Sequence, residues 1–153
     1  MADPADHPGV IAAPPLMYAG VFLIALLLQW LAPLRIFGRT FWPALALVIV
    51  GVALAIWGRN TLVAAGTNVN PYRPATAIVD SGPYRFTRNP LYVSLALMYV
   101  GLTLVFDTWW GFILLAPLLI VMHFGVVRRE ERYLESKFGD GYRRYREKVR
   151  RYL

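Results

Sequence analysis

Four long apolar runs, separated by polar or charged segments, constrain this chain more than any other feature of its sequence. The runs cover residues 16–34, 41–57, 91–106 and 109–127, and 58% of all residues are hydrophobic. As a helix, the first run would be about 28 Å long at ~1.5 Å per residue, enough to cross the hydrocarbon core of a bilayer. The third run is short for a full span. We therefore predict an all-α, polytopic membrane protein that forms a single membrane domain with four transmembrane helices.

The basic residues are divided very unevenly between the two sides that four spans would define. Residues 58–90 hold four arginines and residues 128–153 hold ten Lys or Arg, whereas the connector between the first two runs holds only Arg35 and Arg39. Lys and Arg gather in the cytoplasmic segments of membrane proteins. We therefore expect the N-terminus, the loop and the tail to be cytoplasmic, in a bacterial or archaeal inner membrane.

The remaining composition argues against two kinds of partner. The chain has no cysteine and only two histidines, His7 and His123, which is too few for a histidine-rich or thiolate metal site. The net charge of +7 could indicate nucleic acid binding. However, the basic residues adjoin apolar runs, where anionic lipid headgroups are the nearer partner. We expect membrane lipids as partners, and neither a metal nor a nucleic acid.

The polar stretch 81–92 lies directly before the third run and carries several groups that suit a ligand. Gly82-Pro83 indicates a turn. Asn89 followed by Pro90 predicts a helix start, with Asn89 as the N-cap, and helix N-termini favour anions. The stretch also carries two arginines and two tyrosines: Tyr84, Arg85, Arg88 and Tyr92. Either these residues bind a carboxylate or phosphate, or they only anchor the helix at the membrane interface.

The tail continues the fourth run and carries two adjacent glutamates. On a regular helix, residues three and four apart share a face. Glu131 would then lie on the apolar side, with Phe124, Val127, Leu134 and Phe138. Glu130 would lie nearer His123, Val126, Tyr133 and Lys137. A carboxylate on an apolar face must be paired or functional. An ion-pair network with Arg128 or Arg132 and Glu135 is the structural alternative to a ligand role for Glu131.

A second helix is predicted after the glycines at 139 and 141. Four residues follow at spacings of three, four and three, with arginines on the opposite face: Tyr142, Tyr145, Val149 and Tyr152. This pattern predicts a cytoplasmic C-terminal amphipathic helix, with its aromatic side toward lipid or protein and its basic side toward headgroups. A lid over a bound ligand is the alternative interpretation.

Two motifs together resemble the isoprenylcysteine carboxyl methyltransferase family, integral-membrane enzymes that include phospholipid N-methyltransferase relatives. The first motif is Gly82-Pro83-Tyr84 followed by Arg88-Asn89-Pro90-Leu91-Tyr92. The second is Glu130-Glu131 followed by Leu134, Phe138-Gly139, Tyr142, Tyr145 and Val149. The resemblance covers the chain from residue 66 onward and implies S-adenosylmethionine as methyl donor, bound on the cytoplasmic side. The chain departs from eukaryotic members at Asn89, where they carry histidine, and in having fewer spans.

The resemblance implies a role for each motif residue. Tyr84 and Tyr92 would hold the sulfonium through cation–π contacts. Arg85 or Arg88 would hold the methionine carboxylate, together with the amides that follow Pro90. Asn89 would make an amide contact, and Glu130 or Glu131 would take the ammonium or a ribose hydroxyl. Positioning supplies most of the catalysis of an in-line displacement, so Arg88 and Glu131 are also expected to act in catalysis.

A neutral amine or thiol acceptor would need a general base, and His123 is the nearby candidate, unless it is a packed structural residue. The predicted function is methyl transfer to a lipophilic small molecule or a lipid. A membrane reductase of the sterol-reductase type, using NADPH, is one alternative. A non-catalytic small membrane subunit is the other.

Overall fold

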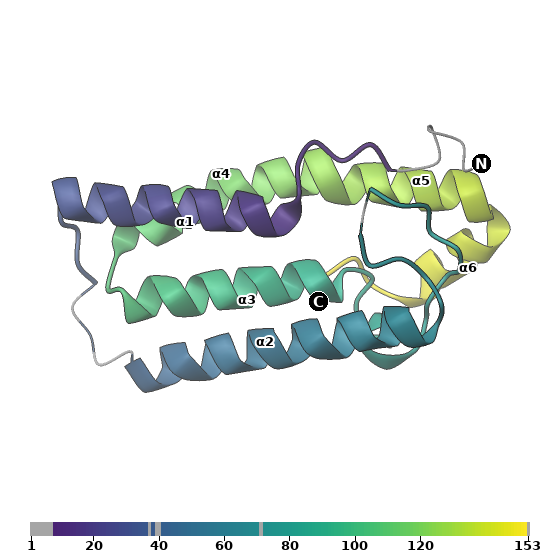
Figure 1. Ribbon diagram of the computed structural model, residues 1–153, viewed down its shortest axis with the longest axis horizontal. Helices are drawn as coiled ribbons and strands as arrows, with labels where there is room; N and C mark the ends of the chain where they lie inside the picture. Colours follow the sequence, from purple (N-terminus) through teal and green to yellow (C-terminus); the bar gives the residue numbers. More distant parts are fainter. Residues whose placement is uncertain (1–7, 37, 39–40, 71, 153) are drawn as a thin grey trace.

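The chain folds into helices joined by loops, as the predicted all-α class requires (Figure 1). The computed structural model describes residues 8–36, 38, 41–70 and 72–152, so His7 and Arg39 lie outside the described residues. The elements in chain order are α1 (Pro14–Leu31), α2 (Phe41–Ala64), the 3₁₀ helix η1 (Gly82–Arg85), α3 (Pro90–Val105), α4 (Trp109–Met122), the π-helix η2 (His123–Val127), α5 (Arg128–Phe138) and α6 (Asp140–Lys148). The described residues contain no strand beyond one isolated bridge, between Thr87 and Arg150.

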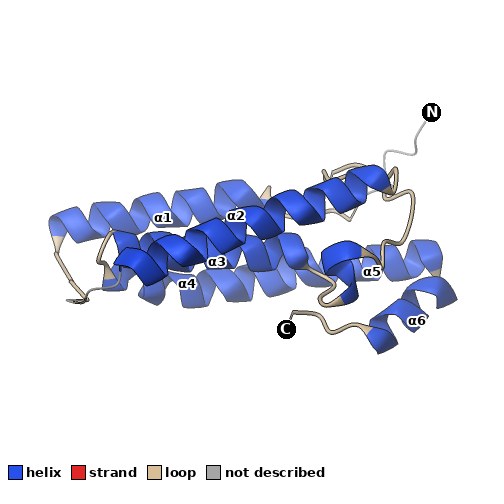
Figure 2. Cartoon of the chain, turned by 90° about the horizontal axis from the view of Figure 1, so that it is seen from below, coloured by secondary structure: helices blue, strands red, loops and turns tan. Residues whose placement is uncertain are grey.

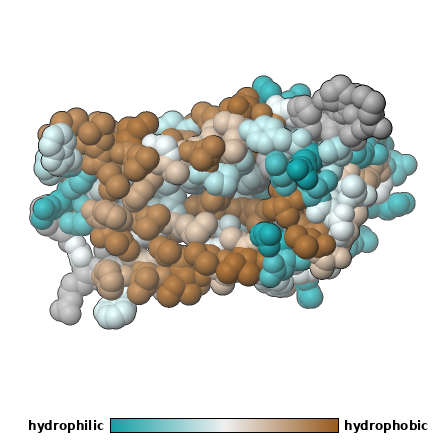
Figure 3. All heavy atoms as spheres, viewed as in Figure 1, coloured by the Kyte–Doolittle hydropathy of each residue, from teal (hydrophilic) through white to brown (hydrophobic). Residues whose placement is uncertain are grey.

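The four apolar helices lie side by side in an elongated bundle, and the polar elements gather at one end of it (Figures 1 and 2). α2 packs chiefly on α3, and α1 packs chiefly on α4. α5 continues the line of α4 past the other helices, and α6 folds back beneath it. Figure 3 shows the same division on the surface, with hydrophobic side chains over the bundle and hydrophilic ones over the end that holds α5 and α6.

In the part of the chain that the structure describes, three helices are long and apolar enough to cross a membrane: α1, α2, and the continuous helix from Trp109 to Phe138. α3 is apolar but has only 16 residues, as the short third run indicated. Large apolar side chains on the outside of the bundle are exposed, among them Leu16, Trp30 and Trp42 at 72–78%. Since burial of apolar surface drives folding in water, such a surface suits contact with lipid.

α2 and α3 approach each other closely because glycines face the partner helix. A Cβ on Gly51 would lie 2.9 Å from the backbone oxygen of Ser94 on α3. A Cβ on Gly101 would lie 2.8 Å from the backbone oxygen of Ala44 on α2. Small residues at such contacts let two membrane helices pack backbone against backbone.

Two predictions need correction. α2 runs to Ala64 rather than ending near Trp57. The predicted end followed the apolar run, but the helix continues through the polar residues beyond it, where Gly58 lies against Leu91 and the Thr61 hydroxyl donates to the Trp57 carbonyl at 2.8 Å. The second correction concerns Asn89, which precedes α3 as predicted but makes no side-chain cap.

The tail breaks where the glycines predicted it would, with Gly139 at φ 53° between α5 and α6. Tyr142, Tyr145 and Val149 are buried in one cluster, packed by Ile78, Leu134 and Phe138. The aromatic side of α6 therefore faces protein rather than lipid.

Candidate functional site

A cavity of about 350 Å³ lies at the polar end of the bundle, where the start of α3 meets α5, α6 and the end of α2. Ligand pockets typically measure about 300–1,000 Å³, so a small organic molecule fits such a space. Seven residues predicted from the sequence line it: Tyr84, Arg88, Asn89, Pro90, Tyr92, Glu130 and Glu131. Apolar residues of α2 and α3 line it as well: Ala55, Leu62, Leu91 and Leu95. The cavity therefore joins a charged, aromatic region to an apolar wall.

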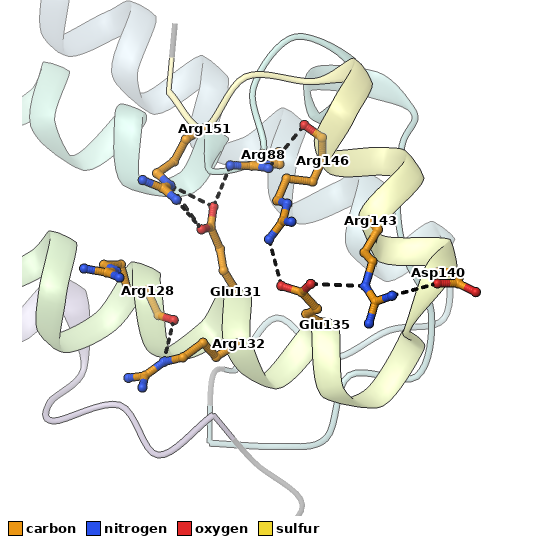
Figure 4. Close-up of polar contacts among 9 residues, drawn as sticks. All are labelled: Arg88, Arg128, Glu131, Arg132, Glu135, Asp140, Arg143, Arg146 and Arg151. Atoms are coloured by element: carbon orange, nitrogen blue, oxygen red, sulfur yellow. Dashed lines mark hydrogen bonds and ion pairs between the residues drawn. The ribbon is translucent and has the colours of Figure 1, made fainter.

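Glu131 is buried between two arginines that come from distant parts of the chain (Figure 4). Nη2 of Arg88, just before α3, lies 2.9 Å from Glu131 Oε1. Arg151, beyond α6, donates from Nε and Nη2 to both carboxylate oxygens at 2.8–3.1 Å. The side chains of Arg88 and Glu131 are only 7% and 12% exposed, so water screens this pair much less than a surface pair. Both oxygens of Glu131 are occupied within the protein.

The ion pairs expected for Glu131 within its own helix do not form. Nε of Arg132 donates to the backbone oxygen of Arg128, and the Arg128 guanidinium lies over the Phe124 ring. Glu135 pairs with Arg143 and Arg146 on α6 instead. The partners that Glu131 does use are separated from it by 43 and 20 residues. Spacing along a helix predicts partners within that helix, so it could not predict these two arginines.

Glu130, the neighbouring carboxylate, is engaged at only one oxygen. Oε2 accepts a hydrogen bond of 2.7 Å from the hydroxyl of Tyr92 on α3. Among the described residues, no hydrogen bond reaches Oε1. Burial raises the pKa of the Glu130 carboxyl, the Tyr92 hydrogen bond opposes that rise, and the charge of Glu131 adds to it. Glu130 lies on charged α5, past the apolar run that ends at Val127, and it lines the cavity.

Arg88 combines a buried charge with unused hydrogen-bonding capacity. Its Nη2 pairs with Glu131, and its Nη1 reaches the backbone oxygen of Arg146 at 3.4 Å. Its Nε is buried and has no hydrogen-bond partner within the described part of the chain. Buried polar atoms usually have partners, so an unpaired one in a cavity lining is a candidate contact for a ligand.

Tyrosines form much of the cavity wall, and α6 supplies two of them. The hydroxyl of Tyr145 donates to the backbone oxygen of Tyr84 at 2.8 Å, which ties α6 to η1. The rings of Tyr142 and Tyr145 lie 6.0 Å apart in an edge-to-face arrangement. Burial raises the pKa values of Tyr84, Tyr142 and Tyr145, so these phenols are neutral at physiological pH. Their electron-rich faces suit contact with a cation.

The π-helix η2 explains why the predicted faces of α5 are only partly correct. A π-helix has more residues per turn than an α-helix and shifts the face of everything that follows it. Phe124, expected beside Glu131, is 55% exposed, whereas Val127 is buried at 1%. Because of the extra residue in η2, the side chains that follow it on α5 do not continue the faces of α4.

The segment Val149–Tyr152, which follows α6, lies against the loop before α3. The backbone N–H of Arg88 donates to the Arg150 carbonyl at 2.9 Å. The Arg151 carbonyl accepts from Asn89 Nδ2 at 2.9 Å and from the Thr87 hydroxyl at 3.1 Å. Asn89 therefore donates to this segment through Nδ2, whereas the predicted cap, in which its side-chain oxygen would accept, does not form.

Two of the predicted site residues do not line the cavity. Arg85 is exposed, with its guanidinium 4.8 Å from the centre of the Phe86 ring. His123 places Nδ1 2.9 Å from the hydroxyl of Tyr152. The structure thus brings Tyr84 and the residues from Arg88 to Tyr92 together with the two glutamates. It places Arg85 and His123 elsewhere.

Several residues in or around the site were not predicted from the sequence. Arg151 stood among ten basic residues of the tail, and nothing in its neighbourhood distinguished it from them. Pro8, Pro14 and Pro15 line the cavity from the N-terminal side, although the sequence there carries no motif. Tyr133 lines the cavity as well, and its hydroxyl accepts from the Ala75 amide at 3.2 Å.

Comparison with known proteins gives one family and two relatives. A family model described as phospholipid methyltransferase matches residues 39–141. An uncharacterized protein of Haemophilus influenzae is 47% identical over 66 residues, which are 41% of this chain and all of that protein. The cobalt-zinc-cadmium resistance protein CzcN of Cupriavidus metallidurans is 33% identical over 112 residues, which are 67% of this chain and 49% of that relative. This chain thus matches about half the length of CzcN. No solved structure matches.

Proposed function

Because this chain belongs to the phospholipid methyltransferase family, we propose that it is a membrane enzyme that transfers a methyl group from S-adenosylmethionine to a lipophilic acceptor. The family match agrees with the resemblance predicted from the two motifs and favours this function over the reductase alternative. The acceptor is a lipid or a lipophilic small molecule, since apolar side chains of α2 and α3 form part of the cavity wall.

One observation carries the proposal: the cavity holds a carboxylate and an arginine that each keep an unused hydrogen-bonding atom. These are Oε1 of Glu130 and Nε of Arg88. S-adenosylmethionine carries an ammonium and a sulfonium that suit a carboxylate, and a carboxylate that suits a guanidinium. The charges of these two side chains and the volume of the cavity therefore fit this cofactor.

Four residues of the cavity have a defined task in the proposed reaction. Glu130 binds the amino group of the cofactor, and Arg88 binds its carboxylate. Tyr84 and Tyr92 offer their ring faces to the positive sulfur. When bound, S-adenosylmethionine supplies a methyl group on a positively charged sulfur, which an acceptor nucleophile takes by in-line displacement.

The protein's own contribution is to hold this geometry and to exclude water, which can account for a large share of the rate. A carboxylate or thiolate acceptor needs no base for this step. His123 is hydrogen bonded to Tyr152 outside the cavity lining, so we assign it no part in the reaction.

We also propose that the cavity faces the cytoplasm. The described end that carries it holds the arginines of the loop and tail, whereas the opposite end holds Arg35. This distribution follows the positive-inside rule. It requires α3 to cross the bilayer as a fourth, short span, which proteins accommodate by local thinning of the membrane or by snorkelling of flanking side chains.

The test is a pair of calorimetric titrations of the purified protein in detergent, one with S-adenosylmethionine and one with NADPH. We expect saturable binding of the first and none of the second. Membranes containing the protein should also move label from the [methyl-³H] donor into the organic-soluble fraction. Binding of NADPH alone would favour the reductase, and binding of neither would favour a non-catalytic subunit.

Two glutamate variants make the test specific to the cavity. Glu130→Gln removes the proposed partner of the ammonium and should weaken donor binding by at least tenfold. Glu135→Gln removes the same charge from the same helix at a position that pairs only with surface arginines, and should bind like the wild type. Equal affinities of the two variants would contradict the role of Glu130.

A further inference from the structure

The loop Thr87–Pro90 depends on a distant part of the chain for its position relative to α5. Within its own neighbourhood it has the Thr87 N–H bond to the Pro83 carbonyl and the Asn89 N–H bond to the Thr87 hydroxyl. Three of its contacts with the rest of the site run through the segment Val149–Tyr152, by way of Arg88 N–H, Asn89 Nδ2 and Thr87 Oγ1. The Arg88 guanidinium also reaches Glu131 and the Arg146 carbonyl directly. The parallel bridge between Thr87 and Arg150 reflects this pairing.

Arg151 stands where the loop, the segment and α5 meet. Its backbone oxygen accepts two hydrogen bonds from the loop, while its guanidinium binds both oxygens of Glu131. A planar guanidinium that binds a carboxylate through two donors fixes both distance and orientation. The same carboxylate also receives Arg88 from the loop, so Glu131 joins the segment to the loop a second time.

The segment itself is held at both ends. Val149 is 8% exposed in the cluster with Tyr142 and Tyr145. The hydroxyl of Tyr152 lies 2.9 Å from Nδ1 of His123. The backbone around Arg151 is therefore held in place, so the hydrogen bonds of Arg151 can fix the positions of the loop and of Glu131.

We infer that Arg151 is a positioning residue of the donor site. It fixes the position of the loop Thr87–Pro90 relative to Glu131, although it does not itself line the cavity. This inference rests on the proposed function, because the loop and Arg88 are assigned there to donor binding. Arg88 and Arg151 together occupy both carboxylate oxygens of Glu131. Glu130 is then the carboxylate left to the donor.

The experiment uses three variants of the full-length protein. Arg151→Gln removes the guanidinium, and Arg151→Lys keeps the charge but loses the planar fork. Arg150→Gln is the matched control, since it removes the same charge from the adjacent, exposed residue and leaves the backbone pairing in place. Hydrogen–deuterium exchange of the peptide that covers residues 86–92 reports on the loop without any donor. Calorimetry with S-adenosylmethionine, well below the unfolding temperature, gives stoichiometry and Kd separately.

We expect Arg151→Gln to speed exchange of this peptide at least tenfold and to raise Kd at least tenfold at unchanged stoichiometry. Arg151→Lys should lie between this variant and the wild type, and Arg150→Gln should match the wild type. A residue that only stabilises the fold would lower the stoichiometry or the melting temperature and leave Kd unchanged, which would overturn the inference. Unchanged exchange of the loop would overturn it too.

The two proposals fail in different ways. If the wild type binds no S-adenosylmethionine, the proposed function fails, and the exchange data still show whether Arg151 sets the loop. If the wild type binds the donor and Arg151→Gln binds it equally well, the proposed function stands and the role of Arg151 is refuted. If Arg151→Gln does not fold, the comparison of Arg151→Lys with Arg150→Gln decides between the same outcomes.

Discussion

The hydroxyl of Tyr92 lies 2.7 Å from Oε2 of Glu130 and donates a hydrogen bond to it across the cavity, from α3 to α5. This bond stabilises the ionised carboxylate, whereas burial and the nearby Glu131 charge raise the pKa of Glu130. A protonated Glu130 would lose its attraction for a cation, so donor affinity should fall as the pH drops through that pKa.

Tyr92→Phe removes the hydrogen bond and should therefore raise the pKa of Glu130 further. The pH at which S-adenosylmethionine affinity is half lost should then move upward. Calorimetric Kd values between about pH 5 and 8 for wild type and Tyr92→Phe provide the check. Glu130→Gln, which cannot titrate, should show a flat profile, and a pH dependence retained in that variant would assign it to another group.

Glu131→Gln should destabilise the protein strongly. It leaves Arg88, at 7% exposure, without its ionic partner, and losing one member of a buried pair typically costs about 3–5 kcal/mol. Glu135→Gln, which breaks exposed pairs, should cost about 1 kcal/mol or less. Thermal and denaturant unfolding in detergent measures the stability of both variants. Equal losses of stability would mean that the burial of the Glu131 ion pair does not make it more stabilising than an exposed pair.

Gly101→Ala should loosen the packing of α2 on α3. Its new Cβ would lie 2.8 Å from the Ala44 backbone oxygen and 3.0 Å from the Val48 nitrogen, so the helices must separate. Overpacking of this kind costs about 1–3 kcal/mol. Gly20→Ala is the control, because nothing lies within 4 Å of its Cβ and alanine is the better helix former by about 1 kcal/mol. Melting temperatures should fall for the first variant and hold or rise for the second.

Single cysteines test the orientation, and the absence of native cysteine gives a clean background. Cysteines at the exposed positions Ser81 and Ser136 should resist an impermeant thiol reagent in intact cells and react after permeabilisation. A cysteine at exposed Gly38, on the opposite end, should react from outside. The reverse pattern would place the cavity on the other side of the membrane.

Features that depend on local sequence were predicted well. The apolar runs gave the helices, Pro90 gave the start of α3, and the glycine at 139 gave the break before α6, because each rests on residues within a few positions of one another. The grouping of Tyr84, Arg88 and the glutamates around one cavity came from the family motifs rather than from periodicity.

Features that depend on tertiary contacts were not predicted. The partners of Glu131 lie at residues 88 and 151, and an arginine that pairs over that distance looks like any other in a basic tail. Asn89 makes no cap, and its side chain instead donates from Nδ2 to the carbonyl of Arg151, which is 62 residues away in the chain. The end of α2 was misplaced because an apolar run marks the part of a helix that suits lipid, whereas the helix itself continues through polar residues to Ala64.

Because of the π-helix His123–Val127, the direction in which α5 presents its side chains depends on the number of residues at this point as much as on their identity. Each residue turns a helix by about 100°, so deleting one residue here would restore the α-helical repeat and rotate α5 by roughly that angle. Both glutamates would then point away from Tyr92 and the two arginines, with no residue of the site replaced. Related proteins that share this site should therefore tolerate substitutions between the apolar span and the glutamates more readily than insertions or deletions.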